Sequence, residues 1–303
     1  MFGRSLLWVA DKPRVQTLIT QSRLTRPVVD RFVAGDLLED AIAAIRELNA
    51  KGIGGILDLL GEGVDDPAGA QAAADDYLAA TKRIAETGID TTVSVKLTQL
   101  GLAFDKSACI DHLRRLAEAG IQAGTTIEID MEQSSYVTDT LEVYRTLRRD
   151  FSDLRIAMQA YLRRTPVDLQ SMAEERPRVR LVKGAYSEPD EVALQRRAEI
   201  DAQYCFLIDW LFTNGDDPAI ATHDSGLIQH AQTAANKAGR GKGDYEIQML
   251  FGIRRDLQDK LAADGHRVRV YVPYGSAWYP YLTRRIAERP ANLHFFLRAL
   301  AGR

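Results

Sequence analysis

A tyrosine and two arginines near the end of the chain have the spacing and the chemistry of an anion-binding helix face. Tyr281, Arg284 and Arg285 are three and four residues apart, and residues at that spacing are neighbours on the surface of an α-helix. An arginine guanidinium is a permanently charged fork that matches a planar carboxylate. The pattern predicts a helix that holds a carboxylate with two cations and one phenol.

Doubled arginines are frequent in this chain, and they leave a simpler interpretation open. Arg-Arg pairs also occur at 114–115, 148–149, 163–164, 196–197 and 254–255. Charged residues on a helix usually meet water rather than a ligand. What distinguishes the pair at 284–285 is therefore its context in the rest of the chain.

Short apolar runs of strand type alternate with helical stretches from residue 53 onward. The predicted strands are 55–60, 92–97, 126–130, 155–160, 179–183, 218–223, 245–250 and 268–272. The predicted helices are 72–87, 107–119, 137–149, 191–211, 226–238, 254–264 and 279–287. Eight strands that alternate with helices predict an α/β fold with a closed, parallel (β/α)8 barrel of the TIM type.

The first 50 residues precede the first predicted strand and are expected to form an N-terminal helical arm, broken at Pro27, that packs on a barrel of residues 51–303. A chain of 303 residues with 46% hydrophobic content can bury a core of that size. The net charge of -3 gives no indication of nucleic-acid binding.

Cysteine and histidine usage predicts neither a disulfide scaffold nor a metal site. Cys109 and Cys205 are far apart in the sequence, and the five histidines lack the spacing of zinc ligands. The apolar run at the N-terminus soon meets Asp11, and it is too short for a secretory signal or a membrane span. These features predict a reduced, cytoplasmic protein.

Polar side chains interrupt the predicted strands at or near their C-terminal ends. Buried parallel strands are usually apolar throughout, so these positions require a reason. Charged strand ends can simply meet water, but seven of the eight strands share the feature. Because the C-terminal ends of the strands form the active-site face of a (β/α)8 barrel, the pattern predicts a site there. The residues are Lys96, Asp130, Gln159, Lys183, His223, Gln248 and Tyr271.

Several motifs, in this order, resemble those of the proline dehydrogenase family. They are Asp130-Met131-Glu132, residues 179–186 (VRLVKGAY), Ala221-Thr222-His223, residues 246–250 (EIQML) and residues 281–285 (YLTRR). The resemblance covers roughly residues 52–298. It implies a distorted (β/α)8 barrel that holds FAD, with the last helix over the flavin rather than beside its own strand. The chain has no room for the aldehyde dehydrogenase domain that some members carry, so it resembles the monofunctional enzyme.

The resemblance implies that L-proline is oxidised to pyrroline-5-carboxylate, the first step of proline catabolism. A hydride would leave the ring carbon beside the nitrogen and pass to FAD, so the protein must orient that carbon. By similarity, Lys96, Arg284 and Arg285 would bind the substrate carboxylate. Leu181, Tyr271 and Tyr281 would form the wall around the ring, and the phenol of Tyr271 is expected to exclude 4-hydroxyproline.

The catalytic group implied by the family is Asp130, Tyr186 and Lys96. Two interpretations of Asp130 stay open: an ion pair with Lys96 from the adjacent strand, or an acid near the flavin that holds a tyrosine or arginine in place. No general base is identified, because the substrate amine can bind already deprotonated.

The chain has no Gly-x-Gly-x-x-Gly loop, so strand ends would have to bind the cofactor. By resemblance, Arg180 would place positive charge at the flavin and raise its potential, while Gly184 and Ala185 are small enough for close approach. A lone histidine such as His223 is more often a core or surface residue. Its place in the Ala221-Thr222-His223 motif favours a role in binding the cofactor instead. The implied cofactor-binding set is Gln159, Arg180, Val182, Gly184, Ala185, Thr222, His223, Gln248, Glu288 and Asn292.

The family commonly passes its electrons to a membrane quinone, which would require peripheral contact with the inner face of the membrane. A functional link to a pyrroline-5-carboxylate dehydrogenase is also implied.

A different class of enzyme, a Schiff-base aldolase that uses Lys183 or Lys96, would need a lysine with a lowered pKa and no flavin. Bound flavin would separate the two.

Overall fold

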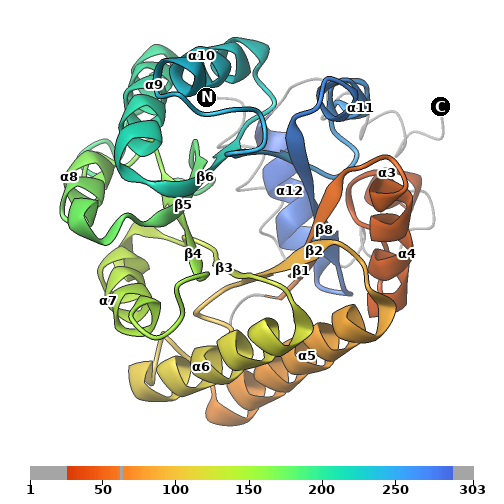
Figure 1. Ribbon diagram of the computed structural model, residues 1–303. Helices are drawn as coiled ribbons and strands as arrows, with labels where there is room; N and C mark the ends of the chain where they lie inside the picture. Colours follow the sequence, from red (N-terminus) through yellow and green to blue (C-terminus); the bar gives the residue numbers. More distant parts are fainter. Residues whose placement is uncertain (1–25, 62–63, 289–303) are drawn as a thin grey trace.

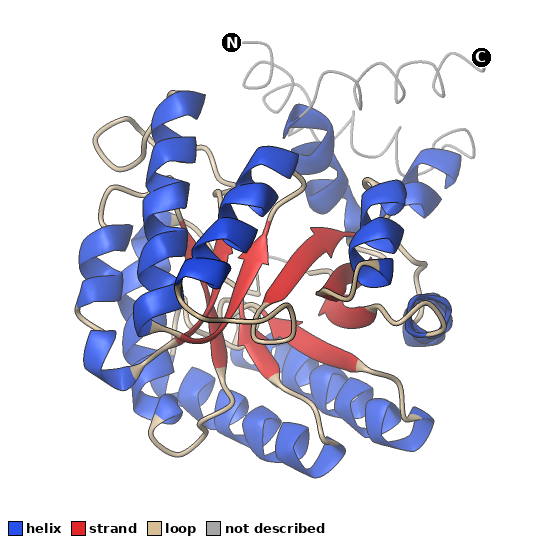
Figure 2. Ribbon diagram, turned by 45° about the horizontal axis from the view of Figure 1, so that its top comes forward, coloured by secondary structure: helices blue, strands red, loops and turns tan. Residues whose placement is uncertain are grey.

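The computed structural model describes residues 26–61 and 64–288, and within them it forms a closed parallel barrel surrounded by helices (Figures 1 and 2). Neighbouring strands pair in sequence order, and β8 closes the barrel on β1. All eight predicted strands are present, so the predicted (β/α)8 barrel is confirmed. The strands are β1 (Gly54–Leu59), β2 (Thr91–Val95), β3 (Ile127–Ile129), β4 (Arg155–Gln159), β5 (Arg178–Val182), β6 (Asp216–Ala221), β7 (Glu246–Leu250) and β8 (Arg267–Tyr274).

The helices are α3 (Arg26–Phe32), α4 (Leu38–Asn49), α5 (Pro67–Thr87), α6 (Lys106–Ala123), α7 (Val137–Arg148), α8 (Thr165–Gln170), α9 (Arg197–Asn214), α10 (Ser225–Lys237), α11 (Arg255–Ala263) and α12 (Trp278–Glu288). The helices α5 to α11 follow β1 to β7 in the outer layer, whereas α3 and α4 precede β1 and α12 comes after β8. The predicted helix 191–211 starts too early, because a bridge between Leu162 and Ala193 holds that segment extended. The short α8 was not predicted, since six residues give little helical periodicity.

Local sequence sets the ends of the long helices. The carboxylates of Asp66, Asp105 and Asp224 accept backbone N–H groups in the first turns of α5, α6 and α10. Such N-caps satisfy donors that the helix itself leaves unpaired. Gly88 and Gly124 end α5 and α6 in the left-handed conformation, with φ of 63° and 66°. Glycine has no Cβ to resist that conformation.

The barrel interior is polar, and the hydrophobic core lies between the strands and the helices. In β8, Arg267 and Arg269 contact Glu246 inside the barrel, whereas the alternate residues Val268 and Val270 are buried in the apolar layer outside it. Successive strand residues point to opposite faces of the sheet, so the arginines of β8 share the inner face and the valines share the outer face. TIM barrels usually fill their interior with branched apolar side chains. Here buried ion pairs take that place.

Two helices at the ends of the chain decide the shape of the site. The helix α4 packs against β8 and β1 and buries Ala41, Ile42 and Ile45 in the shared core, which closes the outer ring at that point (Figure 1). The last helix, α12, contributes Tyr281 to the cavity at the C-terminal ends of the strands. It therefore lies over the mouth of the barrel, as predicted.

The division between the predicted arm and the barrel at residue 50 stays a prediction, and residues 1–25 of the predicted arm lie outside the described part.

Candidate active site

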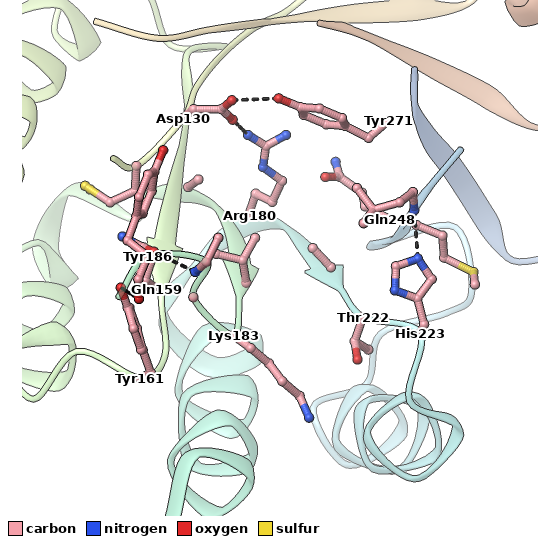
Figure 3. A pocket seen from close by; sticks show the side chains of 18 of the residues that line it. Asp130, Gln159, Tyr161, Arg180, Lys183, Tyr186, Thr222, His223, Gln248 and Tyr271 are labelled. Carbon is pink, nitrogen blue, oxygen red and sulfur yellow. Dashed lines mark hydrogen bonds and ion pairs between the residues drawn. The ribbon is translucent and has the colours of Figure 1, made fainter. Parts of the chain in front are cut away.

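A cavity of about 800 Å³ opens at the C-terminal mouth of the barrel (Figure 3). This volume is near the upper end of the usual range for small-molecule sites, and it is far larger than one proline-sized molecule requires. Most of the predicted site residues line it. They are Lys96, Asp130, Gln159, Arg180, Val182, Gly184, Ala185, Tyr186, Thr222, His223, Gln248, Tyr271 and Tyr281.

Asp130 is the centre of a charged cluster built from four strands. Its carboxylate accepts hydrogen bonds from Ser94 Oγ at 2.7 Å and from Tyr271 Oη at 2.7 Å, and it forms a short ion pair with Arg180 Nη2. Lys96 Nζ lies 3.1 Å from its other oxygen. Burial alone would raise the pKa of Asp130, but Lys96 and Arg180 outweigh burial and hold that pKa well below its ordinary value. Asp130 is therefore a permanent anion that positions three cationic or phenolic partners.

Lys96 bridges two carboxylates, one of which sequence reasoning missed. Its Nζ atom lies 2.7 Å from Asp58 Oδ1, in addition to its contact with Asp130. Burial would lower the pKa of Lys96, yet Asp58, Tyr271 and Asp130 together raise it well above its ordinary value. Burial raises the pKa of Asp58. The predicted Lys96–Asp130 pair is present, and the signal for Asp58 was a carboxylate inside an otherwise apolar strand.

The loop after β5 is clamped against β4. Gln159 Nε2 donates to the carbonyl oxygen of Glu132 at 2.8 Å, and Gln159 Oε1 accepts the N–H of Ala185 at 3.3 Å. Tyr161 Oη donates to the carbonyl oxygen of Tyr186 at 3.1 Å. These bonds fix the backbone that carries two predicted site residues, and Tyr161 is a member of this group that the sequence did not indicate.

The size of Gly184 has a structural reason different from the one predicted. A Cβ atom there would lie 2.2 Å from Cδ1 of the Tyr161 ring, and the residue has a φ of +128°. Any residue with a Cβ at this position would overlap the Tyr161 ring and would also have an unfavourable backbone conformation. Glycine is thus required for the loop to pack, independently of any bound molecule.

On the far side of the cavity, His223 and Gln248 are held by fixed partners (Figure 3). His223 Nε2 accepts the backbone N–H of Leu250 at 2.8 Å, so this nitrogen carries no proton and the ring proton sits on Nδ1. Gln248 Nε2 donates to Glu246 Oε2 at 2.8 Å. Thr222 Oγ1 accepts the N–H of Asp224 at 3.1 Å, which helps to shape the start of α10.

Leu181 does not form part of the cavity wall, which corrects the prediction that it contacts the substrate ring. It is fully buried in the core between barrel and helices, and its carbonyl oxygen accepts a hydrogen bond from Tyr204 of α9. Its neighbours Arg180 and Val182 line the cavity instead. The physical reason is the alternation of a strand, in which residue i faces away from the side that residues i−1 and i+1 share.

Four predicted residues lie where the structure does not test them. Arg284, Arg285 and Glu288 belong to α12, but the directions of their side chains are outside the described part, and Asn292 lies beyond residue 288 altogether.

Within residues 26–61 and 64–288, no three histidine, cysteine or acidic side chains gather to hold a metal ion. Both cysteines are free thiols. No helix in the described ranges is long and apolar enough to cross a membrane.

Comparison with known proteins supports the family that the motifs indicated. A family model described as proline dehydrogenase matches residues 41–298. The chain is 39% identical over 305 residues to a proline dehydrogenase of Deinococcus radiodurans, which covers 99% of this chain and 98% of that protein. It is also 38% identical to proline dehydrogenase 1 of Bacillus subtilis strain 168, over 91% of each chain.

A solved structure shares the fold of the barrel. It is proline utilization A from Bdellovibrio bacteriovorus, inactivated by N-propargylglycine, with 27% identity and a TM-score of 0.82. The match covers 87% of this chain and 32% of that one, so this chain spans about a third of the larger protein. On the match of the family model and the full-length similarity to two relatives, the chain belongs to the proline dehydrogenase family of oxidoreductases.

Proposed function

We propose that this chain oxidises L-proline to pyrroline-5-carboxylate with FAD as the electron acceptor. The observation that carries the proposal is the cluster around Asp130, in which side chains from four different strands meet at the cavity. Bound FAD would supply the acceptor for the hydride that leaves the ring carbon beside the proline nitrogen. The protein then has to bind, orient and desolvate the substrate.

The residues present fit a large polar cofactor. The cavity has room for a second group besides proline, and two of its lining residues have buried polar atoms without a hydrogen-bond partner among the described residues: Nε of Arg180 and Oε1 of Gln248. Buried polar groups are rarely left in that state without a ligand or water. Arg180 would hold the isoalloxazine part, and Gln248, Thr222 and His223 would face the more polar parts.

The charge balance of the cavity supports a role for α12 in binding the substrate carboxylate. The described lining holds four carboxylates and four cations, which leaves no net positive charge for an anion. They are Asp58, Asp130, Asp201 and Asp224, and Lys96, Arg180, Lys183 and Arg197. Lys96 is already bound by two carboxylates, although its ammonium has a third N–H to donate. Arg284 and Arg285 on α12 are therefore proposed as the main anchor, with Tyr281 and Tyr271 beside the ring.

The proposed roles of the catalytic group follow from this arrangement. Asp130 keeps Tyr271 and Arg180 in fixed positions, and Lys96 neutralises the two acids beneath the substrate. Tyr186 lines the cavity on the clamped loop after β5. No residue is assigned as a general base, and the substrate amine is proposed to bind in its neutral form.

A quinone is the proposed final electron acceptor, reached by peripheral contact of a cytoplasmic enzyme with the membrane. A pyrroline-5-carboxylate dehydrogenase is the class of enzyme proposed to consume the product. Both rest on the family rather than on any contact in this structure. Steady-state turnover with a water-soluble quinone analogue and with quinone-loaded vesicles measures the first of these directly.

The proposed function is tested by the visible spectrum of the purified protein under anaerobic conditions. Flavin absorption that bleaches on addition of L-proline, and that does not bleach with D-proline, is the expected result. Formation of pyrroline-5-carboxylate in the same sample identifies the product. A protein that binds no added FAD, or a flavoprotein that proline leaves oxidised, contradicts the proposal and favours a lysine-based barrel enzyme.

A further inference from the structure

A glutamate inside the barrel touches the cluster around Asp130 and has no role in the function described so far. Glu128 lies on β3, two residues before Asp130, which directly follows that strand, so both side chains point into the barrel. Glu128 is fully buried. Its Oε1 atom accepts hydrogen bonds from Thr92 Oγ1 at 2.7 Å and from Arg155 Nη1 at 3.2 Å. Its Oε2 atom lies 3.4 Å from Arg180 Nη1.

Arg180 is consequently placed between two carboxylates of the same strand. Asp130 binds its Nη2 atom, Glu128 faces its Nη1 atom, and Ser94 Oγ lies 3.1 Å from Nη2 on the side. The Tyr271 ring centroid is 5.4 Å from the guanidinium carbon. Arg180 and Glu128 are both buried, so their charges act on each other with little screening by water.

Glu128 is shared between two buried guanidiniums, those of Arg155 and Arg180. Arg155 already has Asp217 Oδ2 at 2.6 Å and Glu246 Oε2 at 2.8 Å, which makes Glu128 the third carboxylate around that one guanidinium. Asp217 also binds Arg178 and Arg267, and Glu246 also binds Arg267 and Arg269. The Oε1 atom of Glu128 faces Arg155 and its Oε2 atom faces Arg180, so the charge of this one residue acts on both guanidiniums.

We propose that Glu128 is a positioning residue that orients the Arg180 guanidinium from within the barrel and weakens the positive field that Arg180 presents to the cofactor. The inference rests on the proposed FAD-dependent function. A cation beside a flavin favours the form with more negative charge, which is the reduced form, and a buried anion behind that cation opposes the effect. Glu128 would therefore lower the reduction potential of the bound cofactor.

The test is the reduction potential of the flavin in Glu128→Gln, measured by equilibration with reference dyes. Glutamine keeps the size of the side chain and removes its charge, so the potential should rise. A tenfold shift of the equilibrium toward the reduced form corresponds to about 30 mV for a two-electron couple, and a rise of that size or more is expected. An unchanged or lowered potential overturns the inference.

Asp217→Asn is the matched control. It removes one carboxylate from the same Arg155 and should lower thermal stability in the same way, but Asp217 lies at the start of β6 and does not line the cavity. Its flavin potential should equal that of the unmodified protein. An equal rise in both variants would mean that any loss of buried charge moves the potential, and it would remove the specific role of Glu128.

A second variant covers the case in which Glu128→Gln does not fold. Glu128→Asp keeps the charge but draws it back by one methylene from Arg180, so the potential should rise above that of the unmodified protein, by less than the value of about 30 mV expected for loss of the whole charge. A potential equal to that of the unmodified protein contradicts the inference. Absence of flavin from the unmodified protein after reconstitution would instead contradict the proposed function, so the two failures are distinguishable.

Discussion

The hydroxyl of Tyr271 on β8 donates a 2.7 Å hydrogen bond to Oδ2 of Asp130 on β3, across the mouth of the barrel. Two strands that do not pair with each other are thus joined directly above the interior ion network. The bond fixes the ring of Tyr271 in the wall of the cavity. Burial, followed by the charge of Asp130, raises the pKa of Tyr271 well above its ordinary value, so the phenol stays a donor.

Tyr271→Phe separates the steric role of this ring from its hydrogen bond. The phenyl ring keeps its bulk, so the proposed preference for L-proline over 4-hydroxyproline should be unchanged. Loss of a charge-assisted bond should lower the free energy of unfolding by about 1.5–3 kcal/mol. Kinetics with both substrates and urea unfolding measure the two effects. Comparable turnover of both substrates by the unmodified protein would contradict the steric role.

Removing Lys96 should destabilise the protein more than removing the whole Lys96–Asp58 pair. Lys96→Met leaves two buried carboxylates facing each other, and breaking a buried ion pair in this way costs about 3–5 kcal/mol. Addition of Asp58→Asn takes away one of those charges and should restore part of the loss. Urea unfolding of both single variants and the double variant tests the coupling, and additive effects would show that the pair does not interact.

Arg284→Ala and Arg285→Ala should each raise KM for proline by about one to two orders of magnitude, as expected for loss of one charge-assisted bond of about 1.5–3 kcal/mol. Arg149→Ala is the matched control, since it is an exposed member of another doubled arginine next to the end of α7. Its KM should not change. Unchanged KM in both α12 variants would leave the simpler interpretation, a solvated helix face.

Gly184→Ala should be more harmful than Gly124→Ala, although both residues have positive φ. A Cβ on Gly184 overlaps the Tyr161 ring, whereas a Cβ on Gly124 meets nothing within 4 Å. The second substitution therefore measures the backbone term alone, on the order of 1 kcal/mol. The first adds overpacking of about 1–3 kcal/mol and should also weaken FAD binding to the apoprotein. Equal unfolding free energies for the two variants would argue against the overlap.

The ion pairs at the bottom of the barrel should make stability depend on pH in the acid range. Burial would raise the pKa of Asp217, but Arg155, Arg267 and Arg178 outweigh it and lower that pKa below its ordinary value. The stabilisation is therefore complete above the unfolded-state pKa of about 4 and is lost as pH falls from there through the folded-state pKa.

Asp217→Asn tests this dependence, because asparagine retains the size of the side chain and tolerates the positive φ of 42° at this residue. The variant should be less stable than the unmodified protein at neutral pH. The difference between the two should shrink below about pH 4, by at most about 1.4 kcal/mol per pH unit. A difference in unfolding free energy that stays constant from pH 7 to pH 3 would be the contrary result.

Local sequence patterns were enough to predict the barrel and most of the residues at its mouth. Strand patterns and turn residues are local signals, so all eight strands could be predicted to within two residues at nearly every end. Polar residues such as Lys96 and Gln159, at strand ends where apolar ones are expected, also marked the active-site face in advance. The motifs around Asp130 and Tyr281 then indicated the family.

The contacts between side chains could not be predicted in this way, because they depend on how the strands are arranged in three dimensions. Glu128 and Arg155 are register partners on the adjacent strands β3 and β4. Glu246 reaches Arg155 from β7, and that contact depends on the closure of the barrel. Asp58 and Tyr161 entered the site for the same reason. Leu181 was misplaced because family motifs name positions, whereas the face of a strand follows from its register, which is set by pairing with its neighbours.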